Sequence, residues 1–258
     1  MIPGSSIPPA EQLYLELLKR CLTRTLFPDS SIISGLAPSP TEFDPALRLD
    51  GRDWPSEAET MIGMIRLNNV QECAVDTLRN RIPGDFVEAG VWRGGAAILM
   101  RAVLAAYGDR TRRVWAADSF EGLPRPDPER YPVDAGDRHW QLSPYLAVPL
   151  EEVKRNFARY GLLDDQVRFI PGWFKDSLPG AAVEEIAVLR IDGDMYESTL
   201  QALTSLYPKL ASGGYLIIDD YGALPNCKAA VLDFRKMFGI RDEIRTIDWT
   251  GVYWQKLA

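Results

Sequence analysis

Histidine is almost missing from this 258-residue chain, which has a single one at His139, so a zinc or iron site built from several histidines is excluded. The three cysteines are odd in number, far apart and without a CxxC pair, which indicates reduced thiols and a cytoplasmic location. No basic run accompanies the net charge of −7, so we expect neither a nucleic-acid partner nor an anionic membrane surface.

Long hydrophobic runs are missing as well. No apolar stretch approaches the roughly 20 residues of a membrane-spanning helix, and the opening residues MIPGSSIPPAEQ have neither the basic nor the apolar region of a signal peptide. Hydrophobic residues nevertheless make up 46% of the chain and charged residues 25%, which is the composition of an ordinary globular protein. A chain of this length can bury a full core as one large domain.

The first 59 residues differ in pattern from the rest. An amphipathic helix is predicted over 10–27, followed by a loop rich in proline, serine and acidic residues, and a second helix over 57–79. We expect 1–59 to form an N-terminal helix and a segment that covers the substrate, and 60–258 to form the main domain. The amphipathic helix is interpreted as a packing or dimer element rather than as a binding device.

From Asp85 onward, short apolar strands alternate with helices. This alternation predicts an α/β fold with a mostly parallel sheet that helices cover on both faces. A Thr-Gly turn near the C-terminus predicts a hairpin, so that one strand of a seven-stranded sheet runs antiparallel. The expected strands are 85–90, 112–118, 166–172, 186–192, 215–220, 243–249 and 252–257, and the expected helices are 94–107, 150–161, 197–210 and 226–239.

Polar or small residues follow each apolar strand, at the edge where sheets of this kind bind ligands. After the first strand, Glu88 precedes a turn with Gly90, Gly94 and Gly95, and glycines let a ligand approach the backbone. The turn favours a nucleotide-like ligand, although it lacks the GxGxxG spacing of dinucleotide-binding sites. The carboxylate of Glu88 suits a ligand that carries an amino group. Asp118, after the second strand, can accept both hydroxyls of a ribose or cap a turn, and beside the glycine turn we favour the ribose.

Three carboxylates close the fourth and fifth strands: Asp192, Asp219 and Asp220. They would repel one another and raise their own pKa values unless a cation compensated for them, and ligands made of oxygen alone favour Mg²⁺. In the alternative interpretation, one carboxylate caps a helix and another pairs with Arg190 or Lys228. Asp194 is expected mainly to cap the helix that follows it.

The segment 120–149 is a proline-rich loop that leaves the second strand at its carboxyl end. Loops of this length are often lids, so we expect it to cover the substrate. Its candidates for the walls of a substrate pocket are Tyr131, His139, Trp140 and Tyr145. A lone histidine is more often structural, and direct chemistry by His139 is the minority interpretation.

Several motifs occur in order along the chain: EAGVWRGG, ADSFEGLP, LRIDGDMYEST, GGYLIIDDYG and GVYW. Together they resemble the macrocin O-methyltransferase type, a family of bacterial enzymes that methylate sugar hydroxyls of macrolides and related antibiotics. The resemblance runs from TMIGMIRLNN to the C-terminus, roughly three quarters of the chain. It implies the Rossmann-like class I methyltransferase fold, S-adenosylmethionine as methyl donor, Mg²⁺ as cofactor, a glycosylated small molecule as substrate and a homodimer.

The resemblance also implies which residues bind the donor. They are Thr60, Met61, Glu88, Gly90, Trp92, Gly94, Gly95, Asp118, Ser119 and Asp176. Glu88 and the glycine turn would hold the methionine part, and Asp118 would bind the ribose. Asp176 would lie beside the adenine.

The metal ligands that the resemblance implies are Asp192, Asp219 and Asp220. We expect Asp192 also to take the proton of the sugar hydroxyl, with His139 as the second candidate. A catechol-type O-methyltransferase is the competing enzyme, but Met195 stands where such enzymes usually have lysine, and Asp219-Asp220 stands where they have Asp-Asn. The other alternative is a nucleotide- or metal-binding module without catalysis, against which the acidic triad argues.

Overall fold

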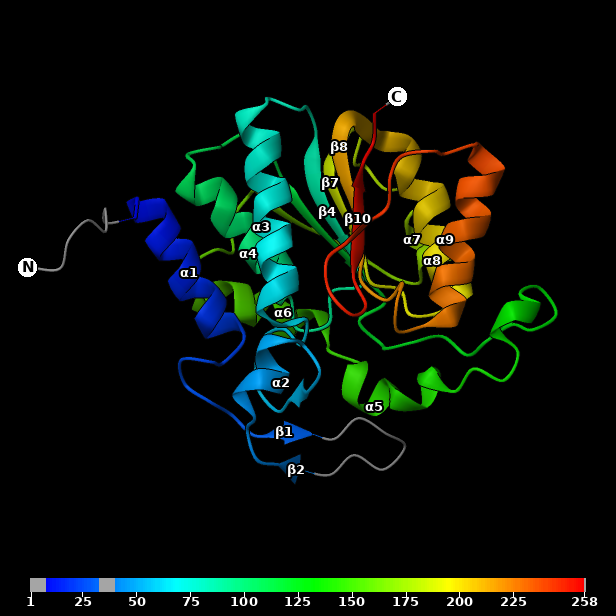
Figure 1. The fold of residues 1–258 in the computed structure, drawn as a ribbon, viewed down its shortest axis with the longest axis horizontal. Helices are drawn as coiled ribbons and strands as arrows, with labels where there is room; N and C mark the ends of the chain where they lie inside the picture. Colours follow the sequence, from blue (N-terminus) through cyan, green and yellow to red (C-terminus); the bar gives the residue numbers. More distant parts are fainter. Residues whose placement is uncertain (1–7, 33–39, 258) are drawn as a thin grey trace, which may run out of the picture.

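A seven-stranded sheet forms the centre of the computed structural model, which describes residues 8–32 and 40–257 (Figure 1). The strands are β4 (Asp85–Ala89), β5 (Val114–Asp118), β6 (Val167–Pro171), β7 (Ile186–Ile191), β8 (Leu210–Ile218), β9 (Arg245–Thr246) and β10 (Val252–Gln255). They lie in the order β6-β5-β4-β7-β8-β10-β9. Neighbours are parallel from β6 to β8, and β10 is antiparallel to both β8 and β9. The predicted mostly parallel sheet with one antiparallel strand is confirmed.

Helices cover both faces of the sheet, as the alternation predicts (Figure 1). On one face lie α3 (Gly63–Arg79), α4 (Gly95–Ala106) and α6 (Leu150–Arg159), with α1 (Ala10–Leu22) packed outside them. On the other lie α7 (Phe174–Ser177), α8 (Tyr196–Leu206), the 3₁₀ turn η3 (Tyr207–Lys209) and α9 (Pro225–Phe238). Helix α1 buries Leu15, Leu18 and Leu22 in the first of these layers, which confirms its predicted packing role.

The second helix begins later than expected, at Gly63 rather than at 57. The residues before it form bends rather than a helical turn, because the Glu59 N–H donates to the carbonyl of Leu22 and the Glu59 carbonyl accepts the N–H of Gly95. A Cβ at Gly95 would lie 2.6 Å from the Glu59 oxygen, so glycine permits this close approach. These bonds place Thr60 beside the start of α4.

The remainder of the N-terminal segment forms a small unit that the sequence did not predict. It contains a three-stranded antiparallel sheet of β1 (Ser31–Ile32), β2 (Pro40–Thr41) and β3 (Trp54–Pro55), with the short helix α2 (Pro45–Leu49). The buried guanidinium of Arg48 holds the unit together through ion pairs with Asp29 (2.6 Å) and Asp53 (2.7 Å). Two-residue strands and long-range ion pairs have no periodicity, so sequence patterns do not reveal them.

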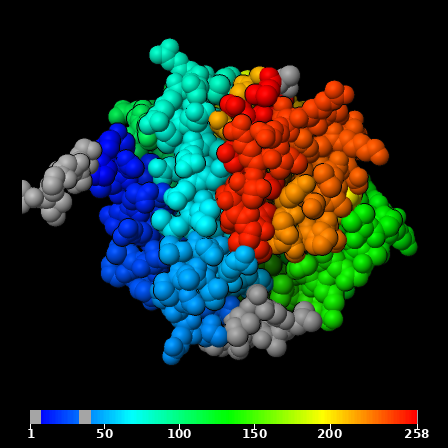
Figure 2. Space-filling model, in the orientation of Figure 1, coloured from blue at the N-terminus to red at the C-terminus, as the bar shows by residue number. Residues whose placement is uncertain are grey.

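The insert between β5 and α6 is not one irregular loop, because it contains η1 (Pro132–Asp134), η2 (His139–Leu142) and α5 (Ser143–Leu146). It is anchored to the main domain by the fully buried Asp134, whose carboxylate accepts the N–H groups of Tyr196 and Glu197 at 2.9 Å each and so caps α8. In the space-filling view its surface adjoins that of α9 (Figure 2). No helix in the described part of the chain is both long and apolar enough to cross a membrane.

Candidate active site

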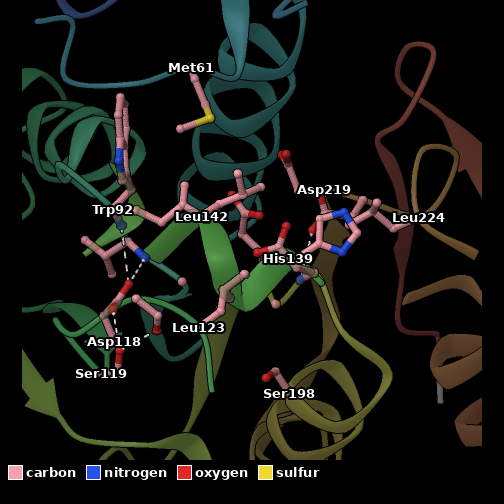
Figure 3. A pocket seen from close by; sticks show the side chains of 18 of the residues that line it. Met61, Trp92, Asp118, Ser119, Leu123, His139, Leu142, Ser198, Asp219 and Leu224 are labelled. Carbon is pink, nitrogen blue, oxygen red and sulfur yellow. Dashed lines mark hydrogen bonds between the residues drawn. The ribbon is translucent and has the colours of Figure 1, made fainter. Parts of the chain in front are cut away.

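A cavity of about 570 Å³ opens at the carboxyl ends of the parallel strands. It is lined by the ends of β4, β5, β7 and β8, by the N-terminal segment and by the insert. Figure 3 shows Asp118 and Ser119 on one side and His139 and Asp219 on the other. The position agrees with the rule for open α/β sheets, which bind ligands at this edge.

Eight of the ten predicted donor-binding residues line this cavity. They are Thr60, Met61, Glu88, Gly90, Trp92, Gly95, Asp118 and Ser119. Gly94 faces away from it, because a Cβ there would lie 3.0 Å from Val153 of α6. Asp176 is exposed on α7 and does not line the cavity, whereas its neighbours Phe174 and Lys175 do.

The glycine turn brings the end of β4 against the end of β7. Gly90 has a φ of 92°, and any Cβ there would collide with the carbonyl oxygen of Asp192. Glycine is therefore required at this position both by the backbone angle and by the lack of space. Through this contact the predicted donor half and the predicted metal half become one site.

Asp118 caps the turn at the end of β5 and also faces the cavity. Its carboxylate accepts the N–H groups of Val91 and Phe120 at 2.7 Å each, as a turn cap does, and it also lines the cavity. Burial raises the pKa of Asp118, and these N–H groups oppose that shift without cancelling it. The carboxylate thus lies at the end of β5 where a polar ligand can reach it.

Arg190 lies at the centre of a buried ion network beneath the cavity. Its guanidinium, 1% exposed, pairs with Glu88 at 2.6 Å, with Asp192 at 3.0 Å and also with Asp219. Asp219 makes a second pair with Arg66, which also binds Asp248. The pairing of an aspartate with Arg190, the alternative interpretation of the sequence, is therefore present for Asp219.

The pKa values of Glu88 and Asp219, both buried in this network, are shifted in opposite directions. Burial raises the pKa of Glu88 to about 8, although Arg190 opposes the shift. Burial would also raise the pKa of Asp219, but Arg190 and Arg66 outweigh it and lower the pKa below its ordinary value. Asp219 is consequently a carboxylate whose charge two guanidinium groups already balance.

The carboxylates that converge in the structure are Asp192, Asp194 and Asp220, whose oxygens lie within 4.8 Å of one another. Asp219 is turned toward the arginines instead, so the predicted trio is not the set that the structure brings together. The expectation that Asp194 caps the next helix is wrong, because Asp134 of the insert occupies that place. Burial, reinforced by the nearby Asp192, raises the pKa of Asp194 to about 7.

Of the four side chains that were expected to wall a substrate pocket, His139 alone lines the cavity. Tyr131 packs on Tyr196 instead, with ring centroids 6.2 Å apart. Apolar residues of the insert and tryptophans from other segments form this part of the wall: Leu123, Leu142, Leu146, Trp54 and Trp249. The leucines of the insert are not aromatic and the tryptophans lie in other segments, so the aromatic residues of the insert did not indicate them.

Tyr145 joins the insert to the N-terminal segment. Its ring stacks on Trp54, with centroids 5.0 Å apart, and its hydroxyl donates to the carbonyl of Pro55 at 2.6 Å. The indole N–H of Trp92 in the glycine turn donates to the backbone carbonyl of Tyr145 at 3.3 Å. The two segments predicted to cover the substrate are thus fastened to each other and to the glycine turn.

We expect the substitution Tyr145→Phe to lower the free energy of unfolding by about 1 kcal/mol, because it leaves the Pro55 carbonyl without this donor. The insert should also become more sensitive to limited proteolysis. Chemical denaturation and timed digestion measure these effects. Tyr131→Phe is the matched control, since the Tyr131 hydroxyl has no hydrogen bond within the described residues; equal behaviour of the two variants would contradict the fastening role.

The sheet order and the strand-end site define a Rossmann-like methyltransferase. The structure superposes on that of the O-methyltransferase NovP with a TM-score of 0.91 at 49% identity, which covers 96% of this chain and 100% of that one. It also matches CalS11, a calicheamicin methyltransferase, with a TM-score of 0.58 at 19% identity over 97% of this chain and 94% of that chain, a likeness of fold alone.

The chain belongs to the macrocin-O-methyltransferase (TylF) family, whose family model matches residues 11–256. It is an O-methyltransferase. It is 53% identical to a Streptomyces olivaceus enzyme, the 8-demethyl-8-(2,3-dimethoxy-alpha-L-rhamnosyl)-tetracenomycin-C 4'-O-methyltransferase, over 96% of this chain and 94% of that one. It is 51% identical to the demethyldecarbamoylnovobiocin O-methyltransferase of Streptomyces niveus, over 95% of this chain and 93% of that one.

Proposed function

We propose that this enzyme transfers a methyl group from S-adenosylmethionine to a sugar hydroxyl of a glycosylated natural product, with Mg²⁺ as cofactor. The observation that carries the proposal is that one cavity joins Glu88 and Asp118 at the ends of β4 and β5 to the carboxylate cluster at the ends of β7 and β8. The names of the relatives, which act on glycosylated antibiotics or their precursors, support this acceptor class.

The donor half of the cavity suits the parts of S-adenosylmethionine. Glu88 would bind the amino group, because one of its carboxylate oxygens is buried without a hydrogen-bond partner in the structure. Asp118 would accept the ribose hydroxyls, and Phe174 with Lys175 would lie by the adenine in place of Asp176. When bound, the donor supplies a methyl group on a positively charged sulfur, and these residues hold it in line with the acceptor oxygen.

The carboxylate cluster fits a hard divalent cation. Asp192, Asp194 and Asp220 offer only oxygen ligands, and burial with mutual repulsion raises their pKa values. The family resemblance implies Asp219 as a third ligand. Here it would support the cluster indirectly, because its ion pairs hold Arg190 and Arg66 in place. Mg²⁺ at the cluster would orient a hydroxyl and make it more acidic.

Two side chains at this end of the cavity are candidates for the proton acceptor, Asp192 and His139. Segments 1–59 and 120–149 would cover the acceptor, since Trp54 of the first and Leu142 of the second line the cavity. The homodimer that the resemblance implies stays a prediction.

The catechol-type alternative is not favoured by the site. Met195 stands where such enzymes usually carry lysine, and its side chain is fully buried. A buried thioether cannot deprotonate or bind a phenolic oxygen in the cavity. The acceptor is therefore proposed to be a sugar alcohol.

Calorimetric titration with S-adenosylhomocysteine in the presence of Mg²⁺ tests the donor, with NAD⁺ as the control ligand. We expect micromolar affinity for the first and no heat from the second, because the turn lacks the dinucleotide spacing. Absence of binding by S-adenosylhomocysteine would sink the donor assignment. The compounds in the names of the relatives then form a panel of candidate acceptors, and mass spectrometry detects methyl transfer to each of them.

A further inference from the structure

A chain of hydrogen bonds runs through the insert to the only histidine of the protein. Asn226, in the first turn of α9, donates its side-chain N–H groups to Asp134 (3.0 Å) and Asp137 (3.2 Å). The carboxylate of Asp137 accepts the backbone N–H of His139 at 2.7 Å and lies 3.0 and 3.1 Å from its ring nitrogen Nδ1. The Asp137 side chain is 5% exposed and the His139 side chain 40%, so the carboxylate is shielded from water while part of the imidazole ring stays open.

The chemistry of the partners determines which ring nitrogen carries the proton. An ionised carboxylate can only accept, so Nδ1 of His139 must be the donor. The other nitrogen, Nε2, lies across the ring from Asp137, and no hydrogen bond to it is found among residues 8–32 and 40–257. His139 lines the cavity, and Figure 3 shows its ring beside Leu224, at the side of the cavity where Asp219 lies.

The second candidate for the proton acceptor is more constrained. The carboxylate of Asp192 pairs with Arg190 and belongs to the cluster that would hold the cation. A carboxylate whose oxygens bind both a guanidinium and a cation has fewer lone pairs free to accept a proton. The imidazole has neither partner on Nε2.

We propose that Asp137 and Asn226 are positioning residues that keep His139 in the Nδ1–H form, with Nε2 presented to the acceptor hydroxyl as its proton acceptor. This inference rests on the proposed function. The O–H bond breaks and the proton joins Nε2, while the electron pair stays on oxygen. That oxygen bonds to the methyl carbon as the carbon–sulfur bond breaks, and its electron pair remains on sulfur, which becomes neutral.

The single histidine makes the tautomer directly measurable. In untagged protein labelled with ¹⁵N-histidine, one imidazole gives the whole NMR signal. At about pH 9, where an ordinary imidazole is neutral, we expect the Nδ1–H form in the wild type. Asp137→Asn should shift the signal toward the Nε2–H form, because an amide can donate to Nδ1. Glu129→Gln, an exposed change in the same insert, is the control and should leave the signal unchanged.

Steady-state kinetics with an acceptor that the panel identifies test the catalytic part. Asp137→Asn and His139→Gln should each lower kcat roughly 10- to 100-fold, with the acceptor KM changed less than about threefold. Asn226→Ala should change the tautomer and kcat in the same direction as Asp137→Asn, but by a smaller amount. It replaces Asp137→Asn as the test variant if that protein does not fold.

Three outcomes would overturn the proposal: an Nε2–H form in the wild type, an unchanged signal in Asp137→Asn, or a changed signal with normal kcat. The NMR measurement needs neither donor nor acceptor. If it gives the expected tautomers while S-adenosylhomocysteine does not bind, the proposed function fails and the positioning of His139 by Asp137 stands as a structural fact without its catalytic role.

Discussion

Turnover by the Asp192→Asn variant should fall at least roughly 10³-fold while affinity for S-adenosylhomocysteine changes less than about threefold. The asparagine side chain would keep the volume of Asp192 but remove the charge that Asp194, Asp220 and Arg190 surround. Glu88 and Asp118, the residues proposed to bind the donor, lie on other strands, so binding of the donor should survive. Calorimetry with S-adenosylhomocysteine and with Mg²⁺, beside a methyl-transfer assay, separates the three effects.

Asp165→Asn is the control for this experiment, because Asp165 is an exposed aspartate outside the cavity. It should match the wild type in all three measurements. Near-normal turnover of Asp192→Asn would contradict the role of Asp192 in the proposed metal site. Loss of donor affinity instead would mean that the variant disturbs the Gly90 turn, which packs on the backbone of Asp192.

The sheet was predictable because its signals are local. Short apolar strands alternate with amphipathic helices, and this pattern alone implies a parallel sheet and places ligands at the carboxyl ends of the strands. Most residues named there, including Glu88, Asp118 and Asp192, do line the cavity, whereas Gly94 and Asp176 do not. The end of the second helix was predicted because its stop signal is also local. Its start at Gly63 depends on backbone hydrogen bonds of Glu59 with Leu22 and Gly95, which local sequence does not show.

The choice of carboxylates depends on register, which strand patterns do not show. Glu88 lies opposite Arg190 across β4 and β7, and Arg190 lies opposite Ile217 of β8. Because side chains alternate between the faces of a strand, Asp219, two residues after Ile217, falls on the side of Arg190, and Asp220 falls on the other. Given this register, the pairing of Asp219 with arginine could have been foreseen.

The surroundings of His139 were predictable only in part. Asp137 stands two residues before it, and such a short-range contact between aspartate and the following backbone is common in turns. The hydrogen bond from Asn226 to Asp137 joins residues 89 positions apart in the sequence, and it depends on how the insert packs against α9. Nothing in the local sequence of either segment indicates this pairing.

We expect Arg190→Met to lower the free energy of unfolding by about 3–5 kcal/mol near neutral pH, because it leaves buried carboxylates without their cationic partner. Methionine replaces the aliphatic part of the arginine side chain, but Glu88 and Asp192 lose their cationic partner and Asp219 keeps only Arg66. Arg113→Met is the matched control, since Arg113 is exposed and its side chain makes no ion pair in the described structure. Urea denaturation measures both variants.

The loss in Arg190→Met should depend on pH, and its sign follows from Glu88. Burial raises the folded-state pKa of Glu88 from an ordinary 4.5 to about 8 even with Arg190 present. A carboxyl group whose pKa is raised by folding stabilises the protein when protonated, so this stability is lost as pH rises through the folded pKa. Because Arg190 lowers this pKa in the wild type, Glu88 of the variant should keep its proton to a pH above about 8, so the loss relative to the wild type should shrink as pH falls toward about 8.

A second substitution tests whether Glu88 is the cause. In the Arg190→Met background, Glu88→Gln should restore part of the lost stability and flatten its pH dependence between 4.5 and about 8, because the amide has no charge to lose or gain. Additive effects of the two substitutions, with the pH dependence unchanged, would contradict the assignment. Arg190 would then stabilise the fold through Asp192 and Asp219 alone, and the donor-side carboxyl would titrate independently of the carboxylate cluster.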